Sequence, residues 1–549
     1  MSFCLLCLLL GLVFGCIPAS AAQICEAQGW RSYECRELSS LQELIKVKAF
    51  PTDNWHRLSI KNQHTEFSIG TASSAESLSS LSDLDLSQVP QLLLQRRGFS
   101  ILPQLKHLNI SGCGLTQLLG THFASESALQ MLDASNNGLS TLTKDVFSNL
   151  RKLIYVNLTQ NALQEFAMPP MAQLQQLDLS HNALLNVSLS ACAHLEQLLL
   201  NDNQLEQLDA LSFRGLNTLQ HLQLSYNSLS NIGKDTFQPL VQLRRLNISH
   251  NVLGALRPQV FGSAAVQSFS LQQLDLSGNS LRLLFDNQFR LLAKLQLLDL
   301  SQNSIASLSS PHFAGLSSLR KLYLQSNDIL EIKPHTFAAL VDLDTLDLSY
   351  NNIESLDDDA FGSKTLPRLR KLNLNANNLK RLHALAFSSL PFVEYLSLGN
   401  NDLRNLDVRM FLPMRQLQKL HLGHNEITEI DRDVLSSLSS VQELLIDNNK
   451  LTFLPYVNDT LPQLKRVAIE GNPWQCACFV KLERWLQSKQ VTYLREGTGY
   501  YDGEKPLCAV TSSNHCVQSV EADQHLDVRF EFEQLHEARQ SEEDSAVQD

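Results

Sequence analysis

Leucines recur along the chain in one pattern, L-x-x-L-x-L-x-x-N-x-L-x-x-L, in which most x positions are polar. Clear copies begin at Leu295, Leu319 and Leu343, so one copy takes 24 residues. In the L-x-L part the apolar and polar residues alternate, which predicts a short strand with its leucines buried and the residue between them in solvent. About eighteen copies can be traced: the pattern recurs from Leu105 onward, and extending it backward adds one copy at Leu81 and a weaker one at Trp55.

Two further positions of each copy carry side chains that suit packing between neighbouring coils. The ninth residue is usually asparagine, and we expect its amide to turn inward and bond to backbone groups of adjacent coils. The nineteenth residue is large and apolar and is expected to fill the side away from the strands. A single coil cannot bury its own edges, so the coils must stack into a solenoid with capped ends. The asparagines include Asn279, Asn303, Asn327, Asn351, Asn377, Asn401, Asn425 and Asn449, and the phenylalanines are Phe123, Phe147, Phe213, Phe237, Phe261, Phe289, Phe313, Phe337, Phe361, Phe387 and Phe411.

Cysteines mark the two expected caps. The solenoid is predicted over residues 55–471, with an N-terminal cap at 23–54 and a cysteine-rich C-terminal cap at 472–516. Six cysteines at the two ends suit disulfides formed in an oxidising compartment. Four cysteines allow three connectivities, and their spacing alone does not choose among them. The cap cysteines are Cys25 and Cys35, then Cys476, Cys478, Cys508 and Cys516.

The motif that follows the last copy, NPWQCAC at residues 472–478, leads into a predicted helix at 479–488. It resembles the cysteine-flanked C-terminal cap of extracellular leucine-rich-repeat proteins. Residues 25–516 are similar to Toll-like receptor ectodomains, chaoptin-like adhesion proteins and soluble insect immune proteins of the mosquito leucine-rich type. The resemblance implies an α/β solenoid, a horseshoe with parallel strands on its concave face and disulfide-capped ends. It also implies the pairings Cys476–Cys508 and Cys478–Cys516, and binding of proteins or microbial products.

The two ends of the sequence predict segments outside the solenoid. Residues 1–22 have a short apolar core and small residues at Ala19-Ser20-Ala21, which favours a secretory signal peptide. The apolar run is shorter than the roughly 20 residues that span a bilayer, so we expect no membrane span. Residues 517–549 are acidic, and we expect a flexible tail there. One short amphipathic helix could form there from Leu526, Phe530, Phe532 and Leu535. The alternative to a flexible tail is a partner-binding segment.

Charge and motifs exclude several functions. A net charge of −12 and a pI near 5.7 argue against the basic face that nucleic-acid binding needs. The sequence has no nucleophile elbow and no glycine loop for phosphate, so we expect neither an enzyme nor a cofactor. No zinc-ligand spacing is present, and a metal shared by His421 and His424 is not favoured. Cys113 and Cys192 are expected to be buried free thiols rather than intermolecular disulfides.

The two halves of the expected concave face differ in their candidate glycosylation sites. Three of five sequons fall on the fifth repeat position, where glycans would crowd the N-terminal half. The ligand is therefore expected between Leu319 and Val441, where tyrosines and basic residues have the composition of interface hot spots. These could instead be ordinary variable positions, and the aspartates of the LDLS strings could form an acidic stripe or merely a solvated face. The sequons are Asn109, Asn157, Asn186, Asn247 and Asn458, and the candidate ligand residues are Tyr323, Tyr350, Tyr395, His421, Arg320 and Arg370.

Together these features predict a secreted protein that binds an extracellular protein or glycoprotein partner. Adhesion, receptor-type signalling and innate immunity are the expected contexts. The alternative function is a structural component of the extracellular matrix that associates with itself, and formation of a homo-oligomer stays open.

Overall fold

The computed structural model describes residues 25–41, 43, 55–61, 66–70, 78–189, 192–262, 269–358, 360–455, 460–495, 501–502, 505–510, 515–517 and 528–537. The predicted signal peptide lies outside these residues. The chain forms two compact units: unit 1 comprises Met1–Val252 with Gln259–Val266, and unit 2 comprises Leu253–Pro258 with Gln267–Asp549.

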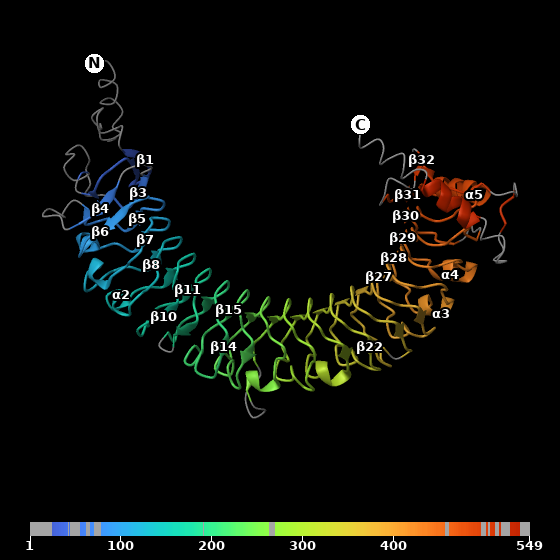
Figure 1. Cartoon of the computed structure of the whole chain (residues 1–549), viewed down its shortest axis with the longest axis horizontal. Helices are drawn as coiled ribbons and strands as arrows, with labels where there is room; N and C mark the ends of the chain where they lie inside the picture. The colour runs from blue at the N-terminus through green and yellow to red at the C-terminus, as the bar shows by residue number, and fades with distance from the viewer. Residues whose placement is uncertain are drawn as a thin grey trace, which may run out of the picture. The chain divides into compact units, whose positions relative to one another are not determined.

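Unit 1 is a ladder of short parallel strands that starts from a hairpin (Figure 1). The hairpin joins β1 (Cys25–Gly29) to β2 (Ser32–Arg36), and β2 then pairs in parallel with β3 (Arg57–Lys61). Each later coil adds one strand in register, because the same L-x-L step recurs in each. The strands that follow are β5 (Asp83–Asp85), β7 (His107–Asn109), β8 (Met131–Asp133), β9 (Tyr155–Asn157), β11 (Gln176–Asp178), β13 (Gln197–Leu199), β15 (His221–Gln223) and β17 (Arg245–Asn247).

Unit 2 continues the same construction and ends in the C-terminal cap. Its last ladder strand comes from the predicted cap, so the ladder extends beyond residue 471. The strands are β18 (Gln273–Asp275), β19 (Leu297–Asp299), β21 (Lys321–Tyr323), β23 (Thr345–Asp347), β25 (Lys371–Asn373), β27 (Tyr395–Ser397), β28 (Lys419–His421), β29 (Glu443–Leu445), β30 (Arg466–Ala468) and β31 (Thr492–Tyr493).

The side of the coils away from the ladder carries short helices and two-stranded pairs (Figure 1). These segments return the chain from one ladder strand to the next. The pairs are β4 (Phe67–Ile69) with β6 (Leu92–Leu94), β10 (Glu165–Ala167) with β12 (Asn186–Ser188), β14 (Gln207–Leu208) with β16 (Asn231–Ile232), β20 (Ser307–Leu308) with β22 (Glu331–Ile332), and β24 (Ser355–Leu356) with β26 (Arg381–Leu382). The helices are η4 (Gly98–Ile101), η5 (Gly120–His122), α2 (Asp145–Ser148), η6 (Pro258–Phe261), η7 (Ser310–Phe313), α3 (Val408–Phe411) and α4 (Arg432–Ser437).

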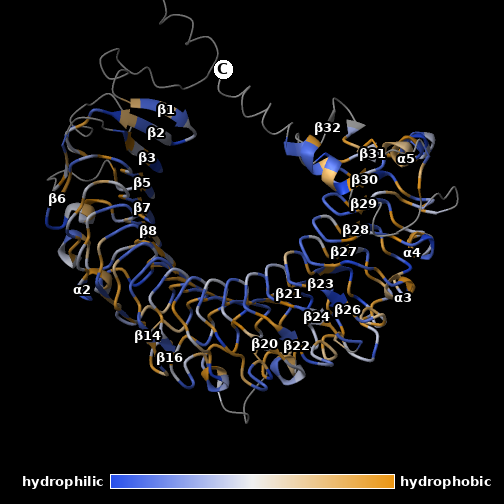
Figure 2. Ribbon diagram, turned by 45° about the vertical axis from the view of Figure 1, so that its right-hand side comes forward, coloured by the Kyte–Doolittle hydropathy of each residue, from blue (hydrophilic) through white to orange (hydrophobic). Residues whose placement is uncertain are grey.

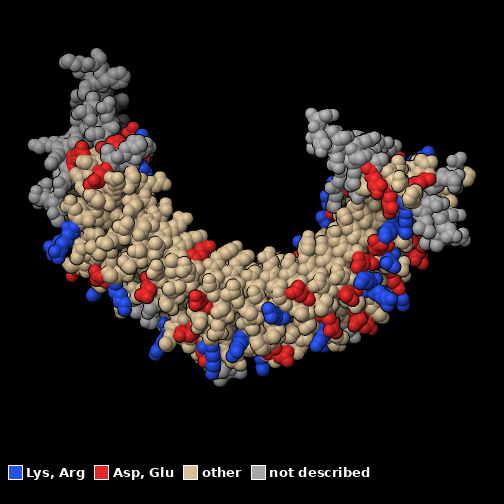
Figure 3. Space-filling view, viewed as in Figure 1, with Lys and Arg blue, Asp and Glu red and all other residues tan. Residues whose placement is uncertain are grey.

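The core lies between the ladder and the returning segments, where Figure 2 shows hydrophobic residues along the inside of the coils. Rings at the nineteenth position stack from coil to coil, as Phe313 does on Phe337 at 5.8 Å between ring centroids. Charged side chains lie on the outer surface (Figure 3). The predicted burial of the phenylalanines is therefore confirmed.

The predicted asparagine ladder is also present. Asn327 Nδ2 donates to the carbonyl oxygens of Leu300 at 2.9 Å and Leu324 at 3.0 Å. Its Oδ1 accepts the backbone N–H of Ile305 at 3.0 Å, so one side chain satisfies groups in two coils. Cys113 stands at the same position, and its Sγ donates to the carbonyl of Leu86 at 3.0 Å. Cys113 and Cys192 are both buried and free, as predicted.

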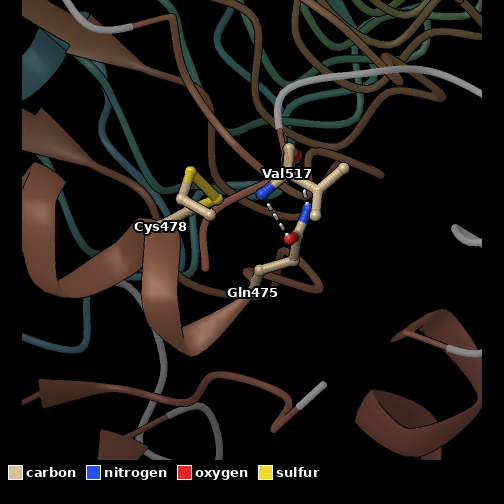
Figure 4. The surroundings of a disulfide bond; sticks show 4 residues. Gln475, Cys478 and Val517 are labelled. Carbon is tan, nitrogen blue, oxygen red and sulfur yellow. Dashed lines mark hydrogen bonds between the residues drawn. A yellow bond between two sulfur atoms is a disulfide. The ribbon is translucent and has the colours of Figure 1, made fainter. Parts of the chain in front are cut away.

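Disulfides close the caps with the expected pairings: Cys25–Cys35, Cys476–Cys508 and Cys478–Cys516. Helix α5 (Cys476–Ser488) starts the C-terminal cap, and the antiparallel pair β32 (Tyr501–Asp502) and β33 (Lys505–Pro506) follows it. The buried side-chain amide of Gln475 makes two hydrogen bonds to the backbone of Val517 (Figure 4). Its Nε2 donates to the carbonyl oxygen at 3.0 Å, and its Oε1 accepts from the backbone N–H at 3.2 Å.

Residues 528–537, in the predicted tail, are helical. Val528 and Phe532 are buried against Ala509 and Leu507 of the cap. Phe530, by contrast, is 63% exposed. This helix is therefore anchored by one apolar side, and residues 538–549 lie outside the described part of the chain.

Candidate binding surface on the strand face of unit 2

The surface that presents three of the six predicted ligand residues is the solvent-facing side of strands β21 to β29, here called the strand face. In each strand the middle leucine is buried and the first residue reaches solvent, because side chains alternate along a strand. The third residue also reaches solvent except in β27, where Ser397 is buried. The first residue occupies the third repeat position and the third residue occupies the fifth. The strand face is therefore two rows of side chains, each running across the ladder.

Tyr323 lies in the fifth-position row between two carboxylates. Its register neighbours are Asp299 on β19 and Asp347 on β23. Partial burial, followed by the charges of Asp299 and Asp347, raises the pKa of the Tyr323 hydroxyl. The phenol therefore stays protonated at neutral pH and can donate a hydrogen bond to a ligand.

The aspartates of the LDLS strings have a defined structural role. Asp299 Oδ1 accepts the backbone N–H of Ser301 at 2.9 Å and its hydroxyl at 2.6 Å. Asp347 makes the same two bonds to Ser349, at 2.9 and 2.6 Å. These bonds shape the turn that follows each strand. One carboxylate oxygen of each aspartate is thus occupied by hydrogen bonds within its own turn. Neither of the two interpretations from the sequence, an acidic stripe that binds a ligand or a merely solvated strand face, includes this structural role.

Tyr395 lies in the third-position row between two lysines, Lys371 on β25 and Lys419 on β28. Just before these strands, Arg370 Nε contacts Glu394 Oε1 at 3.2 Å, and the Arg370 guanidinium lies 5.3 Å from the centre of the Phe392 ring. Tyr395 is thus an aromatic side chain flanked by cations, whereas Arg370 already has partners.

His421 lies on β28 against a glycine of the preceding coil. Its Nδ1 is 3.2 Å from Ser397 Oγ. A Cβ at Gly399 would approach the ring to 2.7 Å, so glycine is needed for the ring to lie there. Burial lowers the pKa of His421, which keeps the imidazole neutral at pH 7.

The same arrangement is repeated one coil later. A Cβ at Gly423 would come within 2.4 Å of Asp447 Oδ1, and the Asp447 side chain is completely buried. Asp447 Oδ2 accepts a bond from Asn448 Nδ2 at 3.0 Å and lies 3.4 Å from His424 Nε2. Sequence reasoning missed both glycines, although each replaces the serine common at the seventh position.

The six predicted ligand residues do not form one cluster. Tyr323, Tyr395 and His421 lie on the strand face, with Tyr323 and Tyr395 about 14 Å apart across three strand spacings. Arg320 and Arg370 immediately precede their strands, at one end of the ladder strands. Tyr350 lies beyond the opposite end, in a left-handed turn with φ of 53°, and is 62% exposed.

In unit 1 the sequons at the fifth position lie on the corresponding side of the ladder. Asn109, Asn157 and Asn247 end β7, β9 and β17. Asn157 Oδ1 accepts the N–H of Thr159 at 3.0 Å, in the manner of the aspartates described above. Asn186 lies on β12, on the other side of the coils, and Asn458 is outside the described residues.

Within the described residues, metal-binding and membrane-spanning features are also relevant to function. No three histidine, cysteine, aspartate or glutamate side chains gather there in a way that could hold a metal ion. Of the helices in that part of the chain, none is both long and apolar enough to cross a membrane.

Comparisons with solved structures show the same fold at low sequence identity. A Leptospira interrogans LRR protein shares 22% identity, with a TM-score of 0.55, over 84% of this chain and all (100%) of that chain. Toll of Drosophila, solved in complex with Spatzle, shares 19% identity, with a TM-score of 0.50, over 79% of this chain and 77% of that chain. The plant peptide hormone receptor RGFR1, in complex with RGF2, shares 19% identity, with a TM-score of 0.52, over 76% and 71% of the two chains.

Sequence comparison identifies the repeat family. No curated protein matches the chain by sequence. The family profile described as leucine rich repeat matches residues 127–184, 193–253, 269–329, 317–364, 367–427 and 415–473. The matched segments cover more than half of the chain and coincide with the coils of both units. The chain therefore belongs to the leucine-rich-repeat family.

Proposed function

We propose that this protein is a secreted binding protein that recognises a protein or glycoprotein partner through the strand face of unit 2. The observation that carries the proposal is the pair of tyrosines on that face, Tyr323 with its protonated hydroxyl and Tyr395 between two lysines. Half-buried tyrosines are typical of interface hot spots, because a rigid ring buries area at a small cost in entropy.

Three features support an extracellular setting and this choice of surface. The caps are closed by disulfides, which persist in oxidising compartments. Glycans on Asn109, Asn157 and Asn247 would occupy the ladder side of unit 1 and leave the strand face of unit 2 open. Two proteins with the same fold, Toll and RGFR1, were solved with bound partners, Spatzle and RGF2.

The test uses the secreted full-length protein. Affinity capture followed by mass spectrometry identifies a partner, and its Kd is then measured by surface plasmon resonance. Tyr323→Ala with Tyr395→Ala should weaken binding at least about tenfold, since each hot-spot ring contributes on the order of 1–2 kcal/mol. Tyr155→Ala is the matched control, because Tyr155 is a half-buried ladder tyrosine of unit 1. An unchanged Kd in the double variant would refute the proposed surface.

Self-association as a matrix component is the second candidate. Light scattering on the purified protein separates the two functions. A monodisperse small species supports recognition of a distinct partner, whereas large assemblies formed without any partner support the matrix function.

A further inference from the structure

A recess with an excess of positive charge lies at the ends where strands β21, β23 and β25 begin. It has a volume of about 590 Å³, and its lining comes from three consecutive coils. The backbone N–H of Asp344 bonds to the carbonyl of Arg320, and that of Arg370 bonds to the carbonyl of Asp344, each at 2.8 Å. These bonds fix the spacing of the lining side chains. The charged recess is lined by Arg320, Lys321, Asp342, Asp344, Arg368 and Arg370.

The ion pairs within and beside the recess do not neutralise all of its positive charge. Arg368 Nη1 contacts Asp342 Oδ1 at 3.1 Å, and Arg370 contacts Glu394 outside the lining. Arg320 and Lys321 make no ion pair with any residue in the described part of the chain. Four cations therefore face two carboxylates, and the two cations on the first coil are free to meet an anion.

Two other basic residues on the ladder of unit 2 differ from Arg320 and Lys321 of the recess. Lys419 and Arg466 both contact Glu443, so each has an ion-pair partner and one carboxylate offsets part of their combined charge. The recess also adjoins the strand face directly, since Lys321 begins the strand that Tyr323 ends. A partner held by Tyr323 would thus extend naturally to Arg320 and Lys321.

We propose that the charged recess is an anion subsite that takes side-chain carboxylates from an acidic segment of a protein partner. The inference rests on the proposed function and deepens it by naming the partner's chemistry. Arginine presents a planar fork of donors that matches a carboxylate in two parallel bonds, and Lys321 adds a point charge beside it. The subsite would therefore favour partners whose carboxylates are correctly placed, and not only partners with enough negative charge.

A carboxylate-bearing peptide fits the recess better than a densely charged polysaccharide does. Coils that carry cations alternate with coils that carry carboxylates, so a continuous polyanion would meet carboxylates at every second coil. These carboxylates are Asp342, Asp344 and Glu394. Charges of both signs are also interspersed over unit 2 on the side seen in Figure 3. Separate carboxylates on a peptide can pair with the cations and avoid the acids.

The experiment measures binding of a synthetic octaglutamate peptide to the full-length protein by fluorescence anisotropy at low ionic strength. Arg320→Ala with Lys321→Ala should weaken binding about tenfold, because two charge-assisted contacts are lost. The matched control is Arg244→Ala with Arg245→Ala, since these exposed residues hold the same repeat positions in unit 1. Thermal melts confirm that both double variants are folded.

Each outcome decides the proposal. Selective loss in the Arg320 and Lys321 variant supports it, and equal loss or no loss in the two variants overturns it. Heparin that binds more tightly than octaglutamate, with the same dependence on Arg320 and Lys321, would replace the acidic peptide by a sulfated polysaccharide. The captured partner is not needed here, so failure of this test leaves the tyrosine test of the proposed function intact.

Discussion

At the scale of single residues, the asparagine ladder shows how a repeated polar side chain stabilises a buried turn. Asn351 Nδ2 donates to Leu324 and Leu348, each at 3.0 Å, and its Oδ1 accepts from Ile329 at 3.1 Å. The amide supplies donors and an acceptor at once, so aspartate or serine cannot replace it fully. Cys113 satisfies the equivalent carbonyl of the preceding coil with a weak S–H donor, which explains why a thiol is tolerated there.

Replacing Asn351 by alanine should lower the free energy of unfolding by about 2–4 kcal/mol, because buried backbone groups in two coils lose their partners. Urea denaturation followed by circular dichroism measures the change. Asn378→Ala is the control, since Asn378 is exposed and should cost less than about 0.5 kcal/mol. Similar destabilisation by both substitutions would contradict the ladder's role.

At the scale of elements, the repeat made the strands, the inward asparagines and the stacked rings predictable, because each depends on spacing within one coil. The positions of Tyr323, Tyr395 and His421 on the strand face followed from the same spacing. Contacts between variable side chains of different coils were not predictable. The pairing of Arg370 with Glu394 and the need for Gly399 beneath His421 depend on which side chains two different coils bring together.

Gly423 illustrates such a contact and allows a direct test. Serine is common at this repeat position, yet Gly423→Ser should lower the free energy of unfolding by about 1–3 kcal/mol, because its Cβ would overlap the buried Asp447 carboxylate. The double variant Gly423→Ser with Asp447→Ser should recover much of the loss. A double-mutant cycle from urea denaturation measures the coupling. Additive effects would show that the close approach is unimportant.

At the scale of the whole molecule, buried and half-buried histidines link stability to pH. Burial lowers the pKa of His122, His221, His312 and His421 below the ordinary value of 6.5. As the pH falls through 6.5, the unfolded chain takes up protons that the folded chain does not yet bind. Folding is therefore progressively weakened until the folded-state pKa values are passed.

Thermal melting should thus occur at a lower temperature at about pH 5.5 than at about pH 7, with His421→Gln reducing the difference. Differential scanning calorimetry at the two pH values provides the measurement. The pKa values of Asp83 and Asp85 are lowered from 3.8, so these carboxylates affect stability only at a pH near or below 3.8. They do not change the stability between about pH 5.5 and pH 7. A melting temperature that is equal or higher in the more acidic buffer would contradict the assignment.

The C-terminal cap has a consequence for solubility. An open ladder end offers a row of unsatisfied amides and carbonyls that can template the addition of another chain, as in fibril growth. Here the ladder narrows from β30 to the two-residue β31, and the chain beyond it is tied to α5 by two disulfides and by the Gln475 amide. The cap therefore prevents another chain from adding to this end of the ladder, and so opposes end-to-end polymerisation.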